Sequence, residues 1–334
     1  MEQIYISKAS TISPQNTFIA DDFFSAEALV CESDKCPAVD PDYKVLITDA
    51  GKRRRMGHLI KMGVSTSLAC LKQADGSLFM PDAMMSATGM GGLEDTEKFL
   101  RCIIDNDEQL LNPSNFIQST GNTFGGQTGL LLGHHGYNVT YAHGGFSMES
   151  ALIDAMLQLK DGSAKTALVT GADEITTTEY EAMRKMGFWR NGRQMGEGSH
   201  SFLLTNEKEG AVCELVDVKT KRPLNESAVD YINSFIGSNG IKAEDVDLVL
   251  TGCDCDYAHL KELEESAFST FNYKHYCGQY ATASGFGLWL GAELIDRGLM
   301  PAANGWEKKQ ARYIVIYNEY RMNDYSLMLL KHTL

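Results

Sequence analysis

The chain has 334 residues, 43% of them hydrophobic, and a formal net charge of −14 at pH 7. This acidic balance argues against nucleic acid as the main partner, and no run approaches the roughly 18 apolar residues of a transmembrane helix, so we expect no membrane span. The length exceeds the roughly 250–300 residues at which single cores usually stop growing, which allows two fused halves.

The N-terminal residues, Met1 to Ser10, lack the apolar run of a secretory signal peptide. The 8 cysteines stand at scattered spacings in a long chain. Both features favour reduced thiols, so we expect a cytoplasmic protein.

A basic run, Lys52 to Arg55, precedes Met56 at the start of an expected helix. Such runs usually form a solvated helix face. The alternative is a patch that docks an acidic partner or packs at a subunit interface.

The segment Asn138 to Ser147 passes from a β-prone stretch through glycines into a helix expected over Met148 to Leu159. His143 stands at the turn, where we expect the free N–H groups and the dipole of the helix N-terminus to favour negative charge. That field suits a thiolate nucleophile, whereas a neutral imidazole gains nothing from it.

The same order of elements occurs twice in the chain. The helix expected over Met148–Leu159 is followed by a tight turn and a strand, and so is the helix expected over Ser284–Asp296. A special turn precedes each helix, at His143 and at Gln279. The repeat predicts a duplicated β-α-β unit, and the turn at Asn206 to Gly210 predicts the boundary between the halves.

Several segments together resemble those of β-ketoacyl synthases of the thiolase superfamily, in a shorter, divergent form. In chain order they are Lys52–Met56, Leu111–Phe116, Ser119–Gly133, Val139–His143, Ala167–Glu174, Met195–Ser199 and Phe202–Leu204. The resemblance implies an α/β architecture, the thiolase-like layered αβαβα fold, with two similar halves at 1–208 and 209–334. It also implies a dimer in which the strand before the nucleophile pairs across the axis.

The resemblance further identifies the positions of the family's catalytic cysteine and two histidines. His143 stands at the nucleophile position. Gly252 or Cys253 stands at the first histidine position. Gln279 replaces the second histidine, although Lys274 of the same pattern is kept.

These replacements remove the groups that condensation needs. Claisen condensation requires a nucleophile that holds the acyl chain as a thioester and donors for the developing oxyanion. Gln279 can donate a hydrogen bond but cannot shuttle a proton near neutral pH, and His143 cannot form a lasting thioester. The family's Gly-Phe-Gly-Gly loop, which would fall at 317–323, is also absent. We nevertheless expect His143, Gln279 and the 252–255 loop to converge in one cavity.

The first interpretation from this resemblance is a degenerate β-ketoacyl-[acyl carrier protein] synthase-like subunit of the chain-length-factor type. It would act in a fatty-acid, polyene or polyketide-type pathway. The expected partners are an acyl carrier protein and either an active synthase subunit or a second copy of the chain. The uncharged segments Gln118–Leu132 and Asn138–Ala142 would then be buried between subunits.

Two alternatives remain open. In the first, an active acyltransferase uses relocated chemistry, with Cys253 or Cys277 as nucleophile and His143 as base. In the second, the chain is a non-catalytic scaffold without a tunnel. No cofactor or metal is expected, because Gly89–Gly92 does not complete a dinucleotide motif and the cysteines near His275 lack the paired spacing of a zinc site.

Overall fold

A computed structural model describes residues 2–29, 33–111, 113–190, 192–253, 257–303, 305–321 and 324–333. In this part of the chain the main sheet has ten strands. From one edge to the other they are β4 (Tyr137–Tyr141), β3 (Ala83–Ala87), β5 (Thr166–Asp173), β7 (Gly198–Thr205), β1 (Tyr5–Ile12), β8 (Cys213–Lys221), β14 (Asp324–Lys331), β13 (Tyr313–Tyr320), β9 (Leu248–Gly252) and β10 (Thr270–Asn272). Two small sheets pair β2 (Lys35–Cys36) with β6 (Met195–Gly196) and β11 (Leu299–Ala302) with β12 (Gly305–Lys308).

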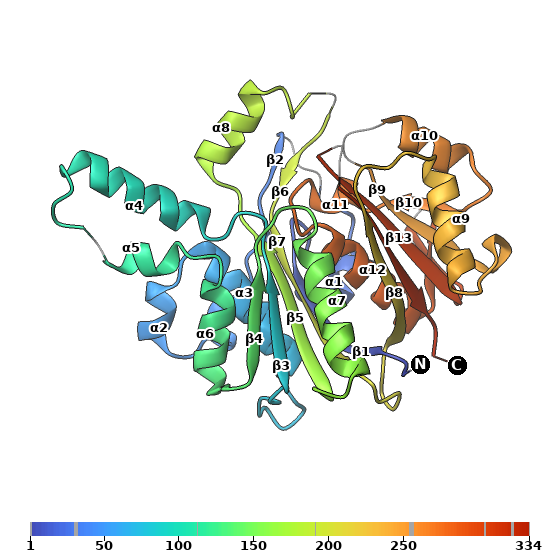
Figure 1. Cartoon of the computed structure of the whole chain (residues 1–334), viewed down its shortest axis with the longest axis horizontal. Helices are drawn as coiled ribbons and strands as arrows, with labels where there is room; N and C mark the ends of the chain where they lie inside the picture. The colour runs from blue at the N-terminus through green and yellow to red at the C-terminus, as the bar shows by residue number, and fades with distance from the viewer. Residues whose placement is uncertain are drawn as a thin grey trace.

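The described helices form layers on and between the two halves of the main sheet. They are α1 (Ala20–Ser25), α2 (Ala50–Arg55), α3 (His58–Leu71), α4 (Leu93–Asp105), α5 (Pro113–Gln118), α6 (Thr123–Leu132), α7 (Ser147–Lys160), α8 (Thr177–Lys185), α9 (Ala228–Ser238), α10 (Tyr257–Glu265), α11 (Lys274–Cys277) and α12 (Ser284–Arg297). Helices α7 and α12 lie between the two halves, α3 and α6 cover one outer face, and α9 and α10 cover the other (Figure 1).

The two halves of the sheet repeat one topology. In the first half β3 is parallel to β4 and β5, while β7 and β1 follow in antiparallel order. In the second half β9 is parallel to β10 and β13, while β14 and β8 follow in antiparallel order. The halves join through short pairing of Tyr5 and Ile6 with Glu214 and Cys213. This is the expected thiolase-like layered αβαβα fold. We propose the division at residue 208, because it falls in the turn between β7 and β8.

The two central helices confirm the predicted repeat. The helix expected over Met148–Leu159 is α7, which leads into β5, and the helix expected over Ser284–Asp296 is α12. The hairpin β11–β12 occupies the connection from α12 to β13. Small residues allow α12 to pack closely, since a Cβ on Gly287 would lie 2.9 Å from a ring carbon of Tyr273.

The basic run lies in a helix, as expected, but at its end rather than its start: it forms the last turn of α2, a short helix capped by Asp49 at the N–H groups of Gly51 and Lys52. The chain turns at Met56 before α3 begins. The thiols are not all reduced, contrary to the expectation, because Cys36 is disulfide-bonded. Of the helices described, none combines the length and the apolar character needed to cross a membrane.

Candidate functional site

A partly open pocket, here called the acyl-type cavity after the ligand that the family resemblance implies, lies where the ends of β5 and β13 face the turn before α12. Its wall is mostly apolar and aromatic, with charged side chains at separate points. The lining residues are Met90, Gly91, Leu93, Asp173, Glu174, Glu179, Met183, Phe188, Trp189, Arg193, Met195, Gly196, Gln279, Tyr280, Ala281, Tyr320 and Arg321. Such a mixture is typical of sites that bind a largely apolar molecule and orient it by a few polar groups.

The beginnings of α7 and α12 meet at the centre of the molecule, as the duplicated fold predicts. Glu149, in the first turn of α7, is fully buried and accepts a hydrogen bond of 2.6 Å from the hydroxyl of Ser326 on β14. Ser284, the first residue of α12, and Lys274 both interact with the same carboxyl group. Burial raises the pKa of Glu149, and its hydrogen bond to Ser326 connects the two halves.

Gln279 lies at the junction of the acyl-type cavity with a second cavity. Its N–H donates to the carbonyl oxygen of Gln194 at 2.9 Å, and its carbonyl oxygen accepts from the N–H of Gly196 at 3.1 Å. The ammonium of Lys274 donates to Oε1 of Gln279 at 3.3 Å and to the carbonyl oxygen of Glu319 at 2.5 Å. The backbone at the second histidine position is therefore held on two sides, and Lys274 contacts its side chain.

The second cavity, of about 500 Å³, brings Cys253, Lys274 and Gln279 together. Its lining is Gly192, Arg193, Gln194, Cys253, Leu260, Asn272, Lys274, His275, Gly278 and Gln279. The first and second histidine positions therefore border one cavity. Asp254 and Cys255, the rest of the predicted loop, lie outside the described residues.

His143 borders neither cavity. The helix begins at Ser147 rather than at the glycine turn, so His143 belongs to the loop between β4 and α7 and is exposed. Its N–H donates to the hydroxyl of Ser147 at 3.0 Å, and its ring Nε2 lies 3.0 Å from the hydroxyl of Ser150. Both contacts are local, and they turn the imidazole along α7.

Cys277, the other thiol considered as a nucleophile, is fully buried beneath Gln279. Burial raises the pKa of its thiol to about 12. A thiol with such a pKa supplies almost no thiolate near neutral pH. Cys253 is only half-buried and borders the second cavity.

A family model of the β-ketoacyl synthase N-terminal domain matches residues 31–222, which is more than half of the chain. The chain belongs to the β-ketoacyl synthase family. No curated protein gives a significant match to this synthase homologue.

Solved structures share the fold over nearly the whole length. The ishigamide ketosynthase/chain length factor matches with a TM-score of 0.77 and 19% identity, covering 99% of this chain and 100% of its own. A β-ketoacyl synthase from Burkholderia phymatum matches with a TM-score of 0.80 and 14% identity over 100% of both chains. A ketosynthase in complex with its chain length factor, from Xenorhabdus doucetiae, matches with a TM-score of 0.76 and 14% identity, covering 99% and 98%. At these identities the likeness shows the fold.

In this β-ketoacyl synthase homologue, Glu174 forms part of the cavity wall. No role for this residue was predicted from the sequence. Its Oε2 accepts the N–H of Leu59 and its Oε1 accepts the N–H of Glu94, each at 3.1 Å, so one carboxyl group caps both α3 and α4. Burial raises the pKa of Glu174 to about 7. The only signal in the sequence was its place at the end of the matched segment Ala167–Glu174.

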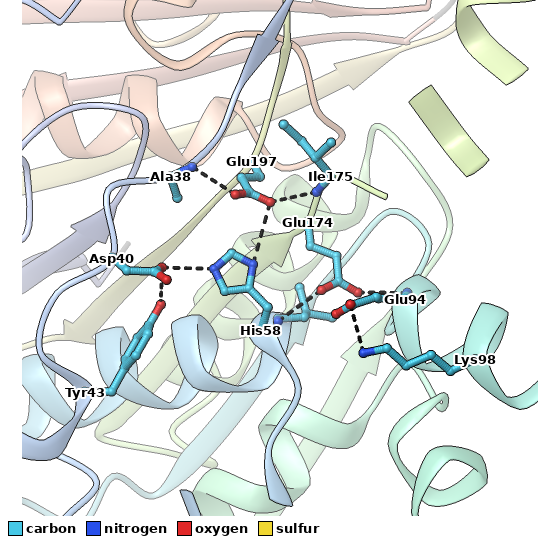
Figure 2. Close-up of polar contacts among 10 residues, drawn as sticks. Ala38, Asp40, Tyr43, His58, Glu94, Lys98, Glu174, Ile175 and Glu197 are labelled. Atoms are coloured by element: carbon cyan, nitrogen blue, oxygen red, sulfur yellow. Dashed lines mark hydrogen bonds and ion pairs between the residues drawn. The ribbon is translucent and has the colours of Figure 1, made fainter. Parts of the chain in front are cut away.

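A second polar group lies behind Glu174 (Figure 2). His58 Nε2 lies 2.9 Å from Oδ1 of Asp40, and Nδ1 lies 3.7 Å from Oε2 of Glu197. Glu197 also accepts the N–H groups of Ala38 and Ile175 at 2.9 and 2.8 Å. Burial alone would lower the pKa of His58, but the hydrogen bond to Asp40 and the charge of Glu197 raise it. This network connects the segment 38–40, the start of α3 and the segment that follows β5.

No group of three histidine, cysteine, aspartate or glutamate side chains suited to a metal ion occurs among the described residues. The arrangement can enclose an apolar chain and offer it amide donors, with the Cys253 thiol in the adjoining cavity.

Proposed function

We propose that the chain is a non-catalytic β-ketoacyl synthase-like subunit of the chain-length-factor type, acting in a fatty-acid, polyene or polyketide-type pathway. The observation that carries the proposal is a largely apolar cavity that Gln279 borders and that has no cysteine among its described lining residues. The turn before α7 carries His143, whose ring bonds to Ser150, and Gln279 stands at the second histidine position. Such a site can hold an acyl chain but lacks the nucleophile that must carry it as a thioester.

The wall of the acyl-type cavity supports an acyl chain as its ligand. Met90, Leu93, Met183 and Trp189 offer apolar surface, and burying a methylene group there contributes about 0.8 kcal/mol. A cavity of this kind would limit how much of a growing chain fits, which is how a subunit without chemistry sets chain length.

We further propose a synthase subunit as partner, bound along β4. This strand stands at one end of the main sheet, and an unpaired strand edge readily accepts another strand. Tyr137 on β4 and Leu130 on the neighbouring α6 are exposed, and so is Ile117, which borders a groove together with Leu130. Exposed apolar residues gathered in this way are typical of a subunit interface. Two structural neighbours are the ishigamide ketosynthase/chain length factor and a ketosynthase in complex with its chain length factor.

An acyl carrier protein is the second proposed partner. Lys52, Arg54 and Arg55 are exposed on α2. Lys52 and Arg55 border a groove of about 980 Å³ whose wall includes the apolar residues Ile117 and Leu130. On a chain with a net charge of −14, this positive patch favours an acidic partner through electrostatic complementarity.

Two measurements test the proposal. The purified chain, incubated with acyl and malonyl carrier-protein thioesters, should form no condensation product and show no acyl adduct by intact-mass analysis. Co-expressed with a synthase that keeps the Cys-His-His set, it should form a one-to-one complex whose product length changes when the cavity is narrowed by Met183→Trp. If the purified chain alone condensed the acyl and malonyl thioesters, the proposal would be contradicted.

The second candidate function is an acyltransferase with relocated chemistry, which the position of Cys253 beside Lys274 and Gln279 favours. Its thiolate would attack an acyl thioester, forming a new thioester and releasing the carrier thiol. An acyl adduct that Cys253→Ser abolishes and Cys102→Ser leaves unchanged would support this candidate.

A further inference from the structure

Two arginines belong to the largely apolar wall of the acyl-type cavity. Arg193 precedes β6 and Arg321 follows β13, and both residues line the cavity. A guanidinium group stays charged at neutral pH and presents a planar fork of donors that matches a carboxylate. A few charged groups in an otherwise apolar wall indicate where the polar part of a ligand is oriented.

Arg321 is held in place at this wall. Its backbone has a φ of +50°, which is uncommon for a residue other than glycine, and such conformations cluster at ligand sites. Its guanidinium carbon lies 5.0 Å from the centre of the Tyr320 ring, a distance at which the ring attracts the cation. Tyr320 also lines the cavity, so this contact keeps the positive charge beside the ligand space.

The ion pair between Arg321 and Glu179 is a loose one. Nη2 of the arginine lies 3.4 Å from Oε1 of the glutamate, which is longer than the roughly 2.7–2.9 Å typical of hydrogen bonds between charged groups. On the same helix, Arg184 donates to Oε2 of Glu181 from both Nε and Nη2, at 3.1 and 2.8 Å. Glu179 is therefore a partner that a well-placed carboxylate of a ligand can replace.

The acids of the cavity leave room for a further negative charge. Burial raises the pKa of Glu174 and that of Glu179 to about 7, so both carry only part of a charge near neutral pH. The oxygens of Asp173 accept hydrogen bonds of 2.6–3.0 Å from the segment after β3 and from the turn before α12. The two arginines therefore roughly balance the acids near neutral pH.

We propose that the acyl-type cavity binds an acyl chain that ends in a carboxylate, and that Arg321 exchanges Glu179 for this carboxylate. Arg193, which lines the same cavity, adds a second positive charge. The inference rests on the proposed function, which places an acyl chain in this cavity, and it adds the chemistry of the far end of that chain. The exchange is binding only, and no covalent bond forms or breaks.

The exchange predicts that Glu179 takes up a proton. Burial is the largest cause that raises its pKa, and the charge of Arg321 lowers it. The other charged groups around it are Asp173 at the end of β5, Glu97 on α4, and the cavity residues Glu174 and Arg193. When Arg321 turns to the ligand and a further negative charge arrives, this pKa must rise again. Binding at about pH 7.5 should therefore take up at most about one proton per ligand.

The test compares two probes of equal chain length. S-octanoyl-N-acetylcysteamine ends in a methyl group, and the N-acetylcysteamine monothioester of suberic acid ends in a carboxylate. Isothermal titration calorimetry should show that the wild-type chain binds the suberyl probe about tenfold more tightly, as a charge-assisted hydrogen bond predicts. Titrations in buffers that differ in ionisation enthalpy measure the proton uptake, which only the suberyl probe should cause.

Substitutions at the ion pair assign the effect. Arg321→Gln should remove both the preference and the proton uptake. Arg321→Lys keeps the charge without the planar fork and should keep part of the preference, which provides a second test if the glutamine variant folds poorly. Glu179→Gln should keep the preference and abolish the uptake. Arg184→Gln, at the exposed pair on the same helix, is the matched control and should change neither.

The outcomes separate this inference from the proposed function. Equal binding of the two probes to the wild-type chain, tighter binding of the octanoyl probe, or a preference that survives Arg321→Gln overturns the carboxylate site but leaves the acyl-type cavity intact. Binding of neither probe overturns both proposals.

Discussion

Arg321 Nη2 lies 3.4 Å from Oε1 of Glu179. The arginine follows β13 in the second half of the chain, and the glutamate belongs to α8 in the first half. Both border the acyl-type cavity, so this ion pair connects the halves at the site. Burial is the largest cause that raises the pKa of Glu179 to about 7, and the charge of Asp173 adds to it. The charge of Arg321 lowers this pKa.

This raised pKa predicts how stability depends on pH. An acid with a higher pKa in the folded than in the unfolded chain contributes stability that is fully present below the unfolded value, near 4.5, and is lost as pH rises through about 7. The free energy of unfolding of the wild type should therefore fall over this range, by on the order of 3 kcal/mol from this group.

Glu179→Gln should remove that part of the pH dependence. Urea unfolding should give equal stability for variant and wild type near pH 4.5, and a more stable variant at pH 8. Glu181→Gln is the matched control, because Glu181 lies on the same helix and pairs with Arg184 at the surface. A Glu179→Gln variant less stable than wild type at pH 8 would show that the ion pair outweighs the burial cost.

Glu174→Gln should loosen the start of one helix. An amide has one acceptor oxygen, so it cannot accept the N–H groups of both Leu59 and Glu94. Hydrogen exchange measured by mass spectrometry should show lost protection in one of the peptides 58–62 or 93–97. Glu94→Gln, which removes only the exposed pair with Lys98, should leave peptide 58–62 unchanged. Unaltered exchange in both peptides of Glu174→Gln would argue against the double cap.

The sequence predicted the elements with long, consistent patterns. The repeated order of helix, tight turn and strand predicted α7 with β5 and α12 with β13 as corresponding parts of a duplicated unit. Gln279 and Cys253 were placed at one cavity because the duplicated fold brings the ends of parallel strands together. These predictions depend on topology, which a pattern of many residues determines.

Positions that depend on a single turn were not predictable in the same way. His143 was expected at the helix N-terminus, but Gly144 takes a φ of +83° and the helix begins at Ser147. The double cap by Glu174 depends on N–H groups from two distant helices, which leave no local signal in the sequence. The capping role of Glu174 therefore follows only from its contacts in the folded structure.

Leu130→Glu should weaken association with a partner subunit. Leu130 lies on α6 beside the β4 edge and is 74% exposed, so the change should cost the isolated chain little while placing a charge in the proposed interface. Light scattering should show less complex, with Kd raised about tenfold or more. Leu29→Glu, at a 44% exposed leucine that borders a groove with Tyr276 of α11 in the second half, should leave association unchanged. Equal effects of the two variants would count against the interface.

Gly145→Ala should destabilise the chain and disturb the acyl-type cavity. A Cβ at this position would lie 2.5 Å from Cδ1 of Tyr320 and 2.8 Å from Oδ2 of Asp324. Because Tyr320 borders the cavity, its displacement should reduce binding of an acyl thioester such as S-octanoyl-N-acetylcysteamine. Overpacking of this kind costs about 1–3 kcal/mol of stability.

Two other glycine variants are the controls. In Gly144→Ala the added methyl group would lie in open space, so the variant should lose only about 1 kcal/mol of stability, because of the positive φ at this position. Gly237→Ala, inside α9 with nothing near the added methyl group, should stabilise by about 0.5–1 kcal/mol. Urea unfolding and probe titration of the three variants check this order, and a Gly145→Ala chain as stable as Gly237→Ala would refute the close contact with Tyr320.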